Sequence, residues 1–243
     1  MIAAEHLIKS YQEQRVITSF THEFLPGQLN TLIGASGSGK TTLLRILLGL
    51  EPASSGTIYY SGKVFSPEEA DQMEAIRQKT GVLFQGGALF DAKTVYENVR
   101  LPLELYSDLS ANEKHHRVME CIARVMLSGK EKRFPSELSG GMKKRAALAR
   151  AIVNKPLYLF CDEPNSGLDP MTSYGIDELI SGITHELQTT TILVTHDMNT
   201  VFSVSDAIVF LHEGEIAWKG SRKDLNAALP LPLQKFMNGY KTQ

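Results

Sequence analysis

The chain has 243 residues, a formal net charge of −2 and 42% hydrophobic residues, values typical of a soluble globular α/β protein. Because its charge is near neutral, it lacks the basic field of a nucleic-acid-binding protein, and we expect no nucleic-acid partner. No apolar run approaches the ~20 residues that span a bilayer, and the start lacks the features of a secretory signal. Cys121 and Cys161 have no CxxC spacing, so we expect reduced thiols in a cytosolic protein that reaches a membrane only by docking onto another protein.

Residues 1–33 predict a β-rich start to the chain. Leu7–Tyr11 and Arg15–Phe20 are short candidate strands, and Leu29–Ile33 is an apolar, β-branched run typical of a buried strand. The segment Phe24–Gln28 contains a Pro-Gly pair and predicts the turn that precedes this buried strand.

The next stretch fits the pattern of Gly, four residues, then Gly-Lys-Ser/Thr. Its residues are Gly34, Ala35, Ser36, Gly37, Ser38, Gly39, Lys40 and Thr41. Glycines let such a loop wrap tightly, so that successive backbone N–H groups point at an anion. Lys40 would reach the β- and γ-phosphates of a nucleotide, and the Thr41 hydroxyl would bind Mg²⁺. A Gly/Ser-rich linker would not explain the buried strand before this stretch or the apolar helix predicted over Thr42–Leu50 after it, so we predict a phosphate loop.

A hairpin and a helix are predicted after the loop. Thr57–Lys63 has the pattern of a hairpin at a sheet edge. Ser66 is expected to cap a helix, with Pro67 at the first helical position and Glu69 completing a capping box. Val82–Gln85 then predicts another buried strand.

Residues 86–137 lack strand signals and carry polar helix formers. Ser110 is expected to cap an amphipathic helix there. Its apolar positions are Val118, Ile122, Val125 and Met126. We therefore expect a helical subdomain over about 86–137, inserted into a single domain whose body comprises residues 1–85 and 138–243.

From residue 138 onward, strand and helix patterns alternate. The predicted elements are a helix over 141–153, a strand over 157–161, a helix over 171–187, and strands over 191–195, 207–211 and 216–218. This alternation predicts a mostly parallel sheet covered on both faces. From it, together with the phosphate loop, the β-rich start and the helical insert, we expect an α/β fold of the P-loop NTPase kind, with this mostly parallel sheet, an N-terminal antiparallel β subdomain and an inserted α-helical subdomain. Such sheets bind ligands at the carboxyl ends of their strands.

Two carboxylates end the apolar run Leu157–Cys161. A buried strand would deliver Asp162 to the phosphate end of the sheet, where it could bind Mg²⁺ through water. Glu163 would be placed to orient or deprotonate an attacking water. A strand that merely ends at solvent would also explain these acids, but the phosphate loop favours the first interpretation.

A second anion site is predicted where Leu138-Ser139-Gly140-Gly141 precedes a long helix. Free N–H groups, a hydroxyl and the positive end of the helix dipole suit an anion, although an ordinary N-cap has the same pattern. We expect the basic cluster Lys143–Arg145 to be a solvated face of that helix.

Taken in order, these motifs resemble the ATP-binding subunit of an ABC transporter over nearly the whole chain. They are the phosphate loop, Gln85, Leu138–Gly141, Asp162–Glu163, Ser166–Asp169 and His196. The resemblance implies ATP and Mg²⁺ as ligands, with Thr42 joining the phosphate loop in nucleotide binding. It implies that Tyr11 stacks on adenine, although a strand aromatic in the core is the alternative. It also implies that Gln85 links Mg²⁺ and the attacking water to the helical subdomain.

In that family two copies pack head to tail around two ATP molecules. The resemblance therefore implies that Ser139, Gly140 and Gly141 bind the γ-phosphate held by a second copy of this chain. It implies that Asp169 shapes the interface between the copies, and that His196 contacts the γ-phosphate.

Four local features look like the Mla/MCE-type phospholipid transporters. They are the loop Gln85–Asp91 with the segment that follows it to Leu103, Met142 where most cassettes have Gln, the run Ser136–Ile152 that contains it, and Leu231–Phe236, whereas Asn165–Asp169 follows the general cassette pattern. Within that loop, Ala88–Phe90 would form a socket for a helix of the permease, unless it only packs locally. The resemblance implies integral membrane permease subunits, an MCE-type substrate-binding protein, a small cytoplasmic regulatory subunit, and a location at the cytoplasmic face of the inner membrane through the permease.

Other functions are compatible with the same motifs. The chain could serve another importer or exporter, or be a soluble ABC ATPase such as one in iron–sulfur cluster assembly. Repair and translation ATPases of this family usually carry two cassettes or large insertions, which this chain lacks. A catalytically inactive regulatory cassette is disfavoured because Lys40, Asp162, Glu163 and His196 are all present.

Overall fold

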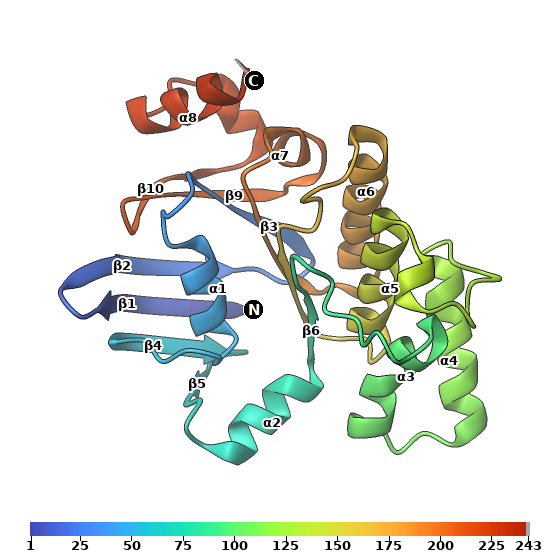
Figure 1. The fold of residues 1–243 in the computed structure, drawn as a ribbon. Coiled ribbons are helices and arrows are strands. Elements are labelled where there is room, and N and C mark those ends of the chain that lie inside the picture. Colours follow the sequence, from blue (N-terminus) through green and yellow to red (C-terminus); the bar gives the residue numbers. More distant parts are fainter. Residues whose placement is uncertain (242–243) are drawn as a thin grey trace.

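Residues 1–241, the part of the chain that this computed structural model describes, form one curled sheet of ten strands with α-helices around it (Figure 1). The strands are β1 (Ile2–Tyr11), β2 (Gln14–Phe24), β3 (Gln28–Ile33), β4 (Ser55–Tyr60), β5 (Lys63–Phe65), β6 (Thr80–Leu83), β7 (Tyr158–Asp162), β8 (Thr190–Thr195), β9 (Ala207–His212) and β10 (Glu215–Gly220). The α-helices are α1 (Lys40–Leu47), α2 (Ala70–Gln78), α3 (Val95–Tyr106), α4 (Ala111–Arg124), α5 (Gly140–Ile152), α6 (Pro170–Leu187), α7 (Met198–Val204) and α8 (Leu231–Lys241).

The sheet has a parallel half and an antiparallel half. Its strand order is β5-β4-β1-β2-β10-β9-β3-β8-β7-β6. The run β9-β3-β8-β7-β6 is parallel throughout, while β1 pairs antiparallel with β2 and β4, and β4 with β5. All residues of β7 and β8 are buried, as expected of parallel strands covered on both faces. The predicted α/β fold with an antiparallel N-terminal part is thus confirmed.

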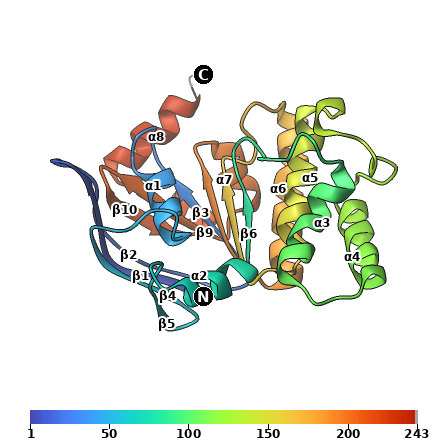
Figure 2. The ribbon, with the colours of Figure 1, turned by 60° about the horizontal axis from the view of Figure 1, so that its bottom comes forward.

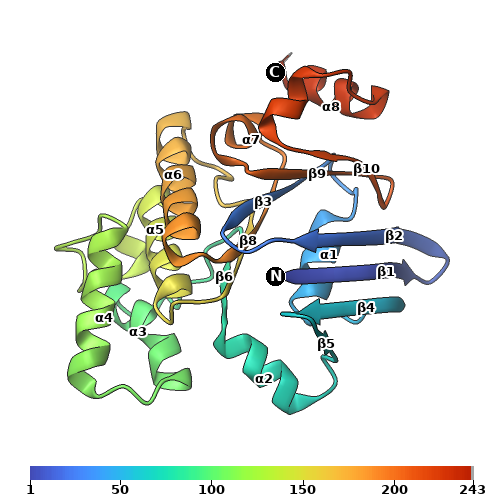
Figure 3. The same cartoon turned by 180° about the vertical axis from the view of Figure 1, so that it is seen from behind.

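Helices cover the two faces with separate cores. On one face the buried residues of α1 pack within the curl of the sheet, against β1, β2, β4 and β8. On the other, apolar residues of α3, α4, α5 and α6 form a single cluster with β6, β7 and β8, and Figure 2 shows these four helices together at one end. Seen from behind (Figure 3), α7 and α8 lie at the same end as β9 and β10, where they share a third cluster. The limits of the helical subdomain remain a prediction.

The expected capping box at Ser66 is wrong. Helix α2 begins at Ala70, and its N-cap residue, Glu69, makes no side-chain capping bond. The Glu69 backbone N–H donates to the Ser66 carbonyl at 3.1 Å, and the Ser66 N–H donates to Gln72 Oε1 at 3.1 Å. A turn after β5 therefore occupies the residues that the local pattern assigned to the first helical turn.

The predicted helix after Ser110 is confirmed except at its end. Ser110 and Glu113 form a reciprocal capping box, and Val118 and Ile122 are buried. Helix α4 ends at Arg124, however, and Met126 has a φ of 59° and a side chain that is 60% exposed. The left-handed residue turns the chain out of the helix, so Met126 leaves the apolar face. Within the described range, none of the helices is long and apolar enough to cross a bilayer.

Candidate active site

The candidate site lies at the carboxyl ends of four neighbouring parallel strands. The phosphate loop follows β3, Glu163 follows β7, His196 follows β8, and Gln85 lies two residues beyond β6. Together they line a cavity of about 600 Å³. Its lining residues are Ala35, Ser36, Gly37, Lys40, Thr41, Gln85, Glu163 and His196, with Lys235, Phe236 and Gly239 from α8. Residues distant in the sequence are thus brought to one place by the order of the strands.

The phosphate loop presents free backbone donors to this cavity. Helix α1 begins after Gly39, which has a φ of 100° and provides no side-chain cap, so the first N–H groups of the helix remain open to an anion. A Cβ atom at Gly39 would lie 2.9 Å from the Val16 carbonyl oxygen. This close approach and the left-handed backbone together explain why the position requires glycine.

The Lys40 side chain packs against the backbone of the phosphate loop. Its Nζ donates to the carbonyl oxygens of Gly34 and Ala35, at 2.8 and 2.9 Å. Burial lowers the pKa of Lys40, and the nearby carboxylates of Glu163 and Asp162 act in the opposite direction. Lys40 also lines the cavity, where a phosphate oxygen could replace a carbonyl as the acceptor of its ammonium group.

The acid pair divides into two environments. Asp162 is buried, and its Oδ1 accepts no hydrogen bond. Burial raises the pKa of this carboxyl, as does the charge of Glu163, while Lys40 lowers it. A buried, unpartnered carboxylate oxygen at the end of the strand that leads to Glu163 suits Mg²⁺, which keeps most of its waters and needs only one or two protein ligands next to a phosphate. These residues fit the predicted ion.

Glu163 and His196 are in contact. Nδ1 of His196 lies 2.8 Å from Oε1 of Glu163, and since a carboxylate only accepts, Nδ1 carries the proton in this contact. The backbone N–H of Glu163 donates to the Val194 carbonyl at 2.9 Å, and Glu163 has a φ of 46°. Non-glycine residues in the left-handed region of backbone conformation cluster at functional sites, and Glu163 combines this conformation with its contact to His196.

Several predicted site residues lie outside the cavity. Ser139 caps α5, and Asp169 caps α6 by accepting from the Thr172 N–H at 3.0 Å. The ordinary N-cap interpretation therefore holds within one chain, and any nucleotide contact of Ser139–Gly141 requires another copy. Tyr11 is 45% exposed at the end of β1, and its hydroxyl donates to Glu51. The core alternative for Tyr11 is therefore wrong, and stacking on adenine remains a prediction.

Two features of the site are not predictable from the sequence. The expected solvated face at Lys143–Arg145 is wrong at Lys144, which is 6% exposed and donates to the carbonyl oxygens of Gln85 and Glu163. Helix α8 was recognised only as a local resemblance, yet Lys235 and Phe236 line the cavity. No periodic or motif signal in the sequence indicates either contact, because both depend on tertiary packing.

Hydrogen bonds from Arg150 hold the first part of the loop after Gln85. Arg150 donates to the carbonyl oxygens of Gly87 and Ala88, at 2.9 and 2.7 Å. Leu89 packs against the helical core, so the local-packing alternative holds for this residue, whereas Phe90 is 51% exposed.

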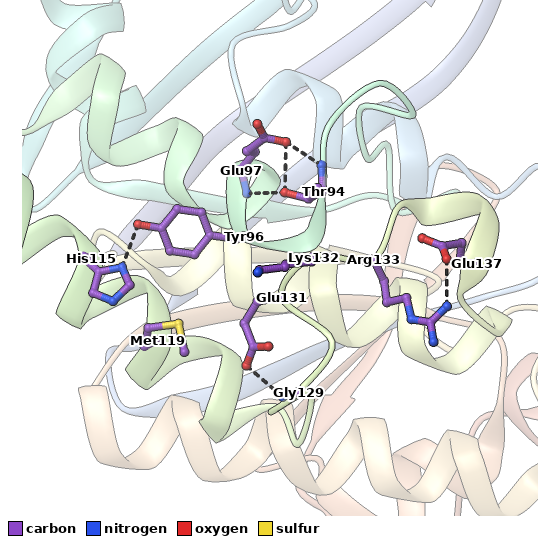
Figure 4. Close-up of a pocket in the computed structure, with 10 residues that line it drawn as sticks. All are labelled: Thr94, Tyr96, Glu97, His115, Met119, Gly129, Glu131, Lys132, Arg133 and Glu137. Carbon is purple, nitrogen blue, oxygen red and sulfur yellow. Dashed lines mark hydrogen bonds and ion pairs between the residues drawn. The ribbon is translucent and has the colours of Figure 1, made fainter.

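A larger cavity, of about 760 Å³, lies in the helical part of the chain (Figure 4). Its carboxylates already accept hydrogen bonds from its own wall: Glu97 from Thr94, Glu131 from the Gly129 N–H, and Glu137 from Arg133. It has neither a phosphate loop nor an unpartnered carboxylate, so the chemistry belongs to the smaller cavity.

A phosphate loop after β3, an acid pair at the end of β7 two strands away, and a Glu–His contact at the same end of the sheet define a phosphate-loop NTPase. The chain belongs to the ABC transporter family, because the family described as "ABC transporter" matches residues 17–166. It is therefore an ATPase cassette of the ABC type.

Curated relatives differ in the substrates that they are named for. The chain is 43% identical over 204 residues to methionine import ATP-binding protein MetN 1 of Pseudomonas putida, covering 84% of this chain and 60% of the relative. It therefore spans about three fifths of that protein. It is 37% identical over 240 residues to the probable ribonucleotide transport ATP-binding protein mkl of Mycobacterium tuberculosis, covering 99% of this chain and 67% of the relative.

Solved structures with the same fold are ABC cassettes. The dimeric post-hydrolysis state of cassette MJ0796 bound to ADP and Pi has a TM-score of 0.83 and 29% identity, covering 91% of this chain and 99% of that one. The cbiO1 protein of Clostridium perfringens, part of the ABC transporter complex cbiONQ, has a TM-score of 0.85 and 28% identity, covering 92% and 89%.

We expect Tyr11→Ala to raise the KM for ATP about tenfold with little change in kcat, because base–aromatic stacking contributes about 1–3 kcal/mol. Tyr11→Phe is the matched control, since it keeps the ring and loses only the hydroxyl bond to Glu51. Steady-state ATPase assays over a range of ATP concentrations measure the effect. An unchanged KM in the alanine variant would show that Tyr11 does not stack on the base.

Proposed function

We propose that this chain hydrolyses ATP to energise phospholipid transport of the Mla/MCE type through a membrane permease. The lipid assignment is supported by the loop Gln85–Asp91, Met142 and Leu231–Phe236. The 43% identity to a methionine-import protein favours amino-acid import as the second candidate. In either case the chain would lie at the cytoplasmic face of the inner membrane, held there by the permease.

Two copies of this chain would form the working unit. The dimeric solved cassettes support this proposal, as does the position of Ser139–Gly141 outside the chain's own cavity. Each nucleotide would lie between the phosphate loop of one copy and Ser139–Gly141 of the other, with Asp169 at the interface. ATP would thereby join the copies, and the like-charged products of hydrolysis would separate them.

Within each site, charge stabilisation would supply most of the catalysis. Lys40, the N-terminal N–H groups of α1 and His196 would stabilise negative charge on the γ-phosphoryl group. Glu163 would orient the attacking water and accept its proton, while His196, whose Nδ1 faces Glu163 at 2.8 Å, would hold that carboxylate in place. Mg²⁺, bound by Thr41 and Asp162 with Gln85 nearby, would neutralise phosphate charge.

The permease would dock onto an apolar groove next to Gln85. The groove measures about 390 Å³, and its exposed apolar side chains are Phe84, Phe90, Leu105 and Tyr106. Exposed apolar clusters of this kind mark interaction surfaces. Phe84 lines the groove and the next residue, Gln85, lines the nucleotide cavity. A docked permease helix that displaced Phe84 would therefore also displace Gln85.

We expect Phe90→Glu to weaken permease binding at least about tenfold, because buried aromatic anchors dominate interface energies. The matched control is Val64→Glu, which places the same charge at an exposed position of β5, away from the groove. Co-purification from detergent-solubilised membranes followed by mass spectrometry measures the effect. Equal recovery of permease with both variants would contradict docking at this groove.

The same purification tests the lipid assignment. We expect the wild-type chain to carry a permease, bound phospholipid, an MCE-type substrate-binding protein and a small cytoplasmic regulatory subunit. A methionine-binding partner in place of the lipid components would establish the second candidate. A purely soluble partner set would point instead to an ABC ATPase without a permease, such as one in iron–sulfur cluster assembly.

A further inference from the structure

Lys144 occupies an unusual position for a charged side chain. It lies on the first turns of α5, which begins immediately after Ser139, and its side chain points into the protein rather than toward solvent. A buried ammonium group is costly unless its hydrogen bonds are satisfied. Among residues 1–241, its hydrogen-bond acceptors are two backbone carbonyls, those of Gln85 and Glu163, the second at 3.5 Å.

Those two carbonyls belong to the two loops that carry the chemistry. Gln85 and Glu163 both line the nucleotide cavity. The loops are also joined directly, because Nε2 of Gln85 donates to Ser166 Oγ at 3.2 Å. Lys144 therefore bridges three segments: helix α5, which Ser139 caps, the loop at Gln85, and the loop at Glu163.

This bridge contacts the backbone of a residue whose conformation is uncommon for a non-glycine residue. Glu163 has a left-handed backbone with a φ of 46°, a conformation that persists only when surrounding contacts maintain it. Its N–H donates to the Val194 carbonyl at 2.9 Å, and its C=O faces the Lys144 ammonium group at 3.5 Å. The orientation of the Glu163 side chain is thus coupled to the position of α5.

We propose that Lys144 is a positioning residue that ties α5 to the backbone of Gln85 and Glu163, so that docking of Ser139–Gly141 on a second copy's nucleotide sets the Glu163 carboxylate for hydrolysis. An apolar side chain at this position would fill the same space and leave both carbonyls without the cation. The inference rests on ATP hydrolysis between two copies of this chain, and it is independent of the transported substrate.

The test compares Lys144→Met, which keeps the length of the side chain but has no donor, with Lys144→Arg, which keeps the charge and the donors. We expect Lys144→Met to lower kcat at least tenfold while the KM for ATP changes less than twofold, because the nucleotide contacts of the phosphate loop remain. Lys144→Arg should recover most of kcat. The matched control, Lys143→Met on the neighbouring and more exposed lysine, should have wild-type kinetics.

A second measurement separates positioning from folding. In the Glu163→Gln background, which cannot hydrolyse ATP rapidly, we expect Lys144→Met to leave the ATP-dependent dimer intact in size-exclusion chromatography. Unchanged kcat in Lys144→Met would overturn the proposal. So would a joint loss of thermal stability and dimerisation that Lys144→Arg does not restore, since that pattern indicates a structural role. Absence of ATPase activity in the wild-type chain would overturn the premise itself, whatever the outcome of the lipid experiments.

Discussion

Glu163→Gln should still bind ATP but lose hydrolysis by on the order of 10²- to 10⁴-fold, the usual contribution of a general base. The amide has the shape of the carboxylate but cannot accept a proton from water. The phosphate loop, including Lys40, is untouched, so nucleotide affinity should stay within a few-fold of wild type. Because ATP would join the two copies and persist between them, the variant should accumulate as an ATP-dependent dimer.

Two measurements check this result. ATPase assays report turnover, and size-exclusion chromatography with and without ATP reports the dimer. Glu178→Gln is the matched control, because Glu178 is an exposed glutamate of α6 outside the cavity. Near-normal turnover in Glu163→Gln would exclude this residue as the base and would remove the mechanism proposed for the Glu163–His196 pair.

We expect ionisation of the buried Asp177 carboxyl to lower the free energy of unfolding as the pH rises from 4 to 6. Its side chain is 3% exposed, and burial raises the pKa of its carboxyl from 3.8 to about 6, with the charges of Asp197 and Glu178 acting in the same direction. Hydrogen bonds from Asn165, at 2.7 Å, and Thr200, at 2.9 Å, act in the opposite direction. Burial dominates, so the folded state favours the neutral acid.

The direction of this change in unfolding free energy follows from the number of protons bound in each state. Between pH 4 and 6 the folded state holds the Asp177 proton while the unfolded state has released it, so the free energy of unfolding falls as the pH rises. The cost is absent below the unfolded pKa and complete above the folded one. A shift of this size corresponds to about 3 kcal/mol.

Asp177→Asn removes this titration. We expect the difference in unfolding free energy between variant and wild type to move by about 2 kcal/mol in favour of the variant between pH 4 and pH 7, since part of the full cost is already present at pH 4. The lost or rearranged hydrogen bonds add a constant that does not vary with pH. Urea denaturation at several pH values measures the difference, with Asp71→Asn, at an exposed residue of α2, as the control. Parallel stability curves for wild type and Asp177→Asn would show that Asp177 is not buried as a neutral acid.

Local signals in the sequence were sufficient for the phosphate loop and for the strands around it. Glycine spacing specifies the loop because its backbone conformations are local. The strands β3, β7 and β8 could be recognised from their continuous apolar runs, and the carboxyl ends of parallel strands converge. These two facts place Asp162 and Glu163 at the same edge of the sheet as Lys40, whereas His196 is placed there by the resemblance to ABC transporter cassettes.

Local patterns failed where tertiary contacts competed with them. Ser66 has the pattern of a capping residue, but the turn after β5 uses its backbone groups instead. Met126 has helical spacing, yet the chain leaves the helix before it. Lys144 is predicted to be exposed by its charge, but it is buried because two loops distant in the sequence present carbonyl oxygens to it.

By itself, the sequence therefore determined the nucleotide chemistry of this protein and the residue types that would perform it, because these are encoded in short motifs with fixed spacing. Only the tertiary structure decided how those residues meet. The 2.8 Å contact between Glu163 and His196, the place of Lys235 in the same cavity as the phosphate loop and the bridge from Lys144 to the loops at Gln85 and Glu163 arise from long-range packing. The same packing leaves Ser139–Gly141 outside the cavity of their own chain. Residues that would bind the nucleotide of a second copy need no contact with the cavity of the chain that carries them.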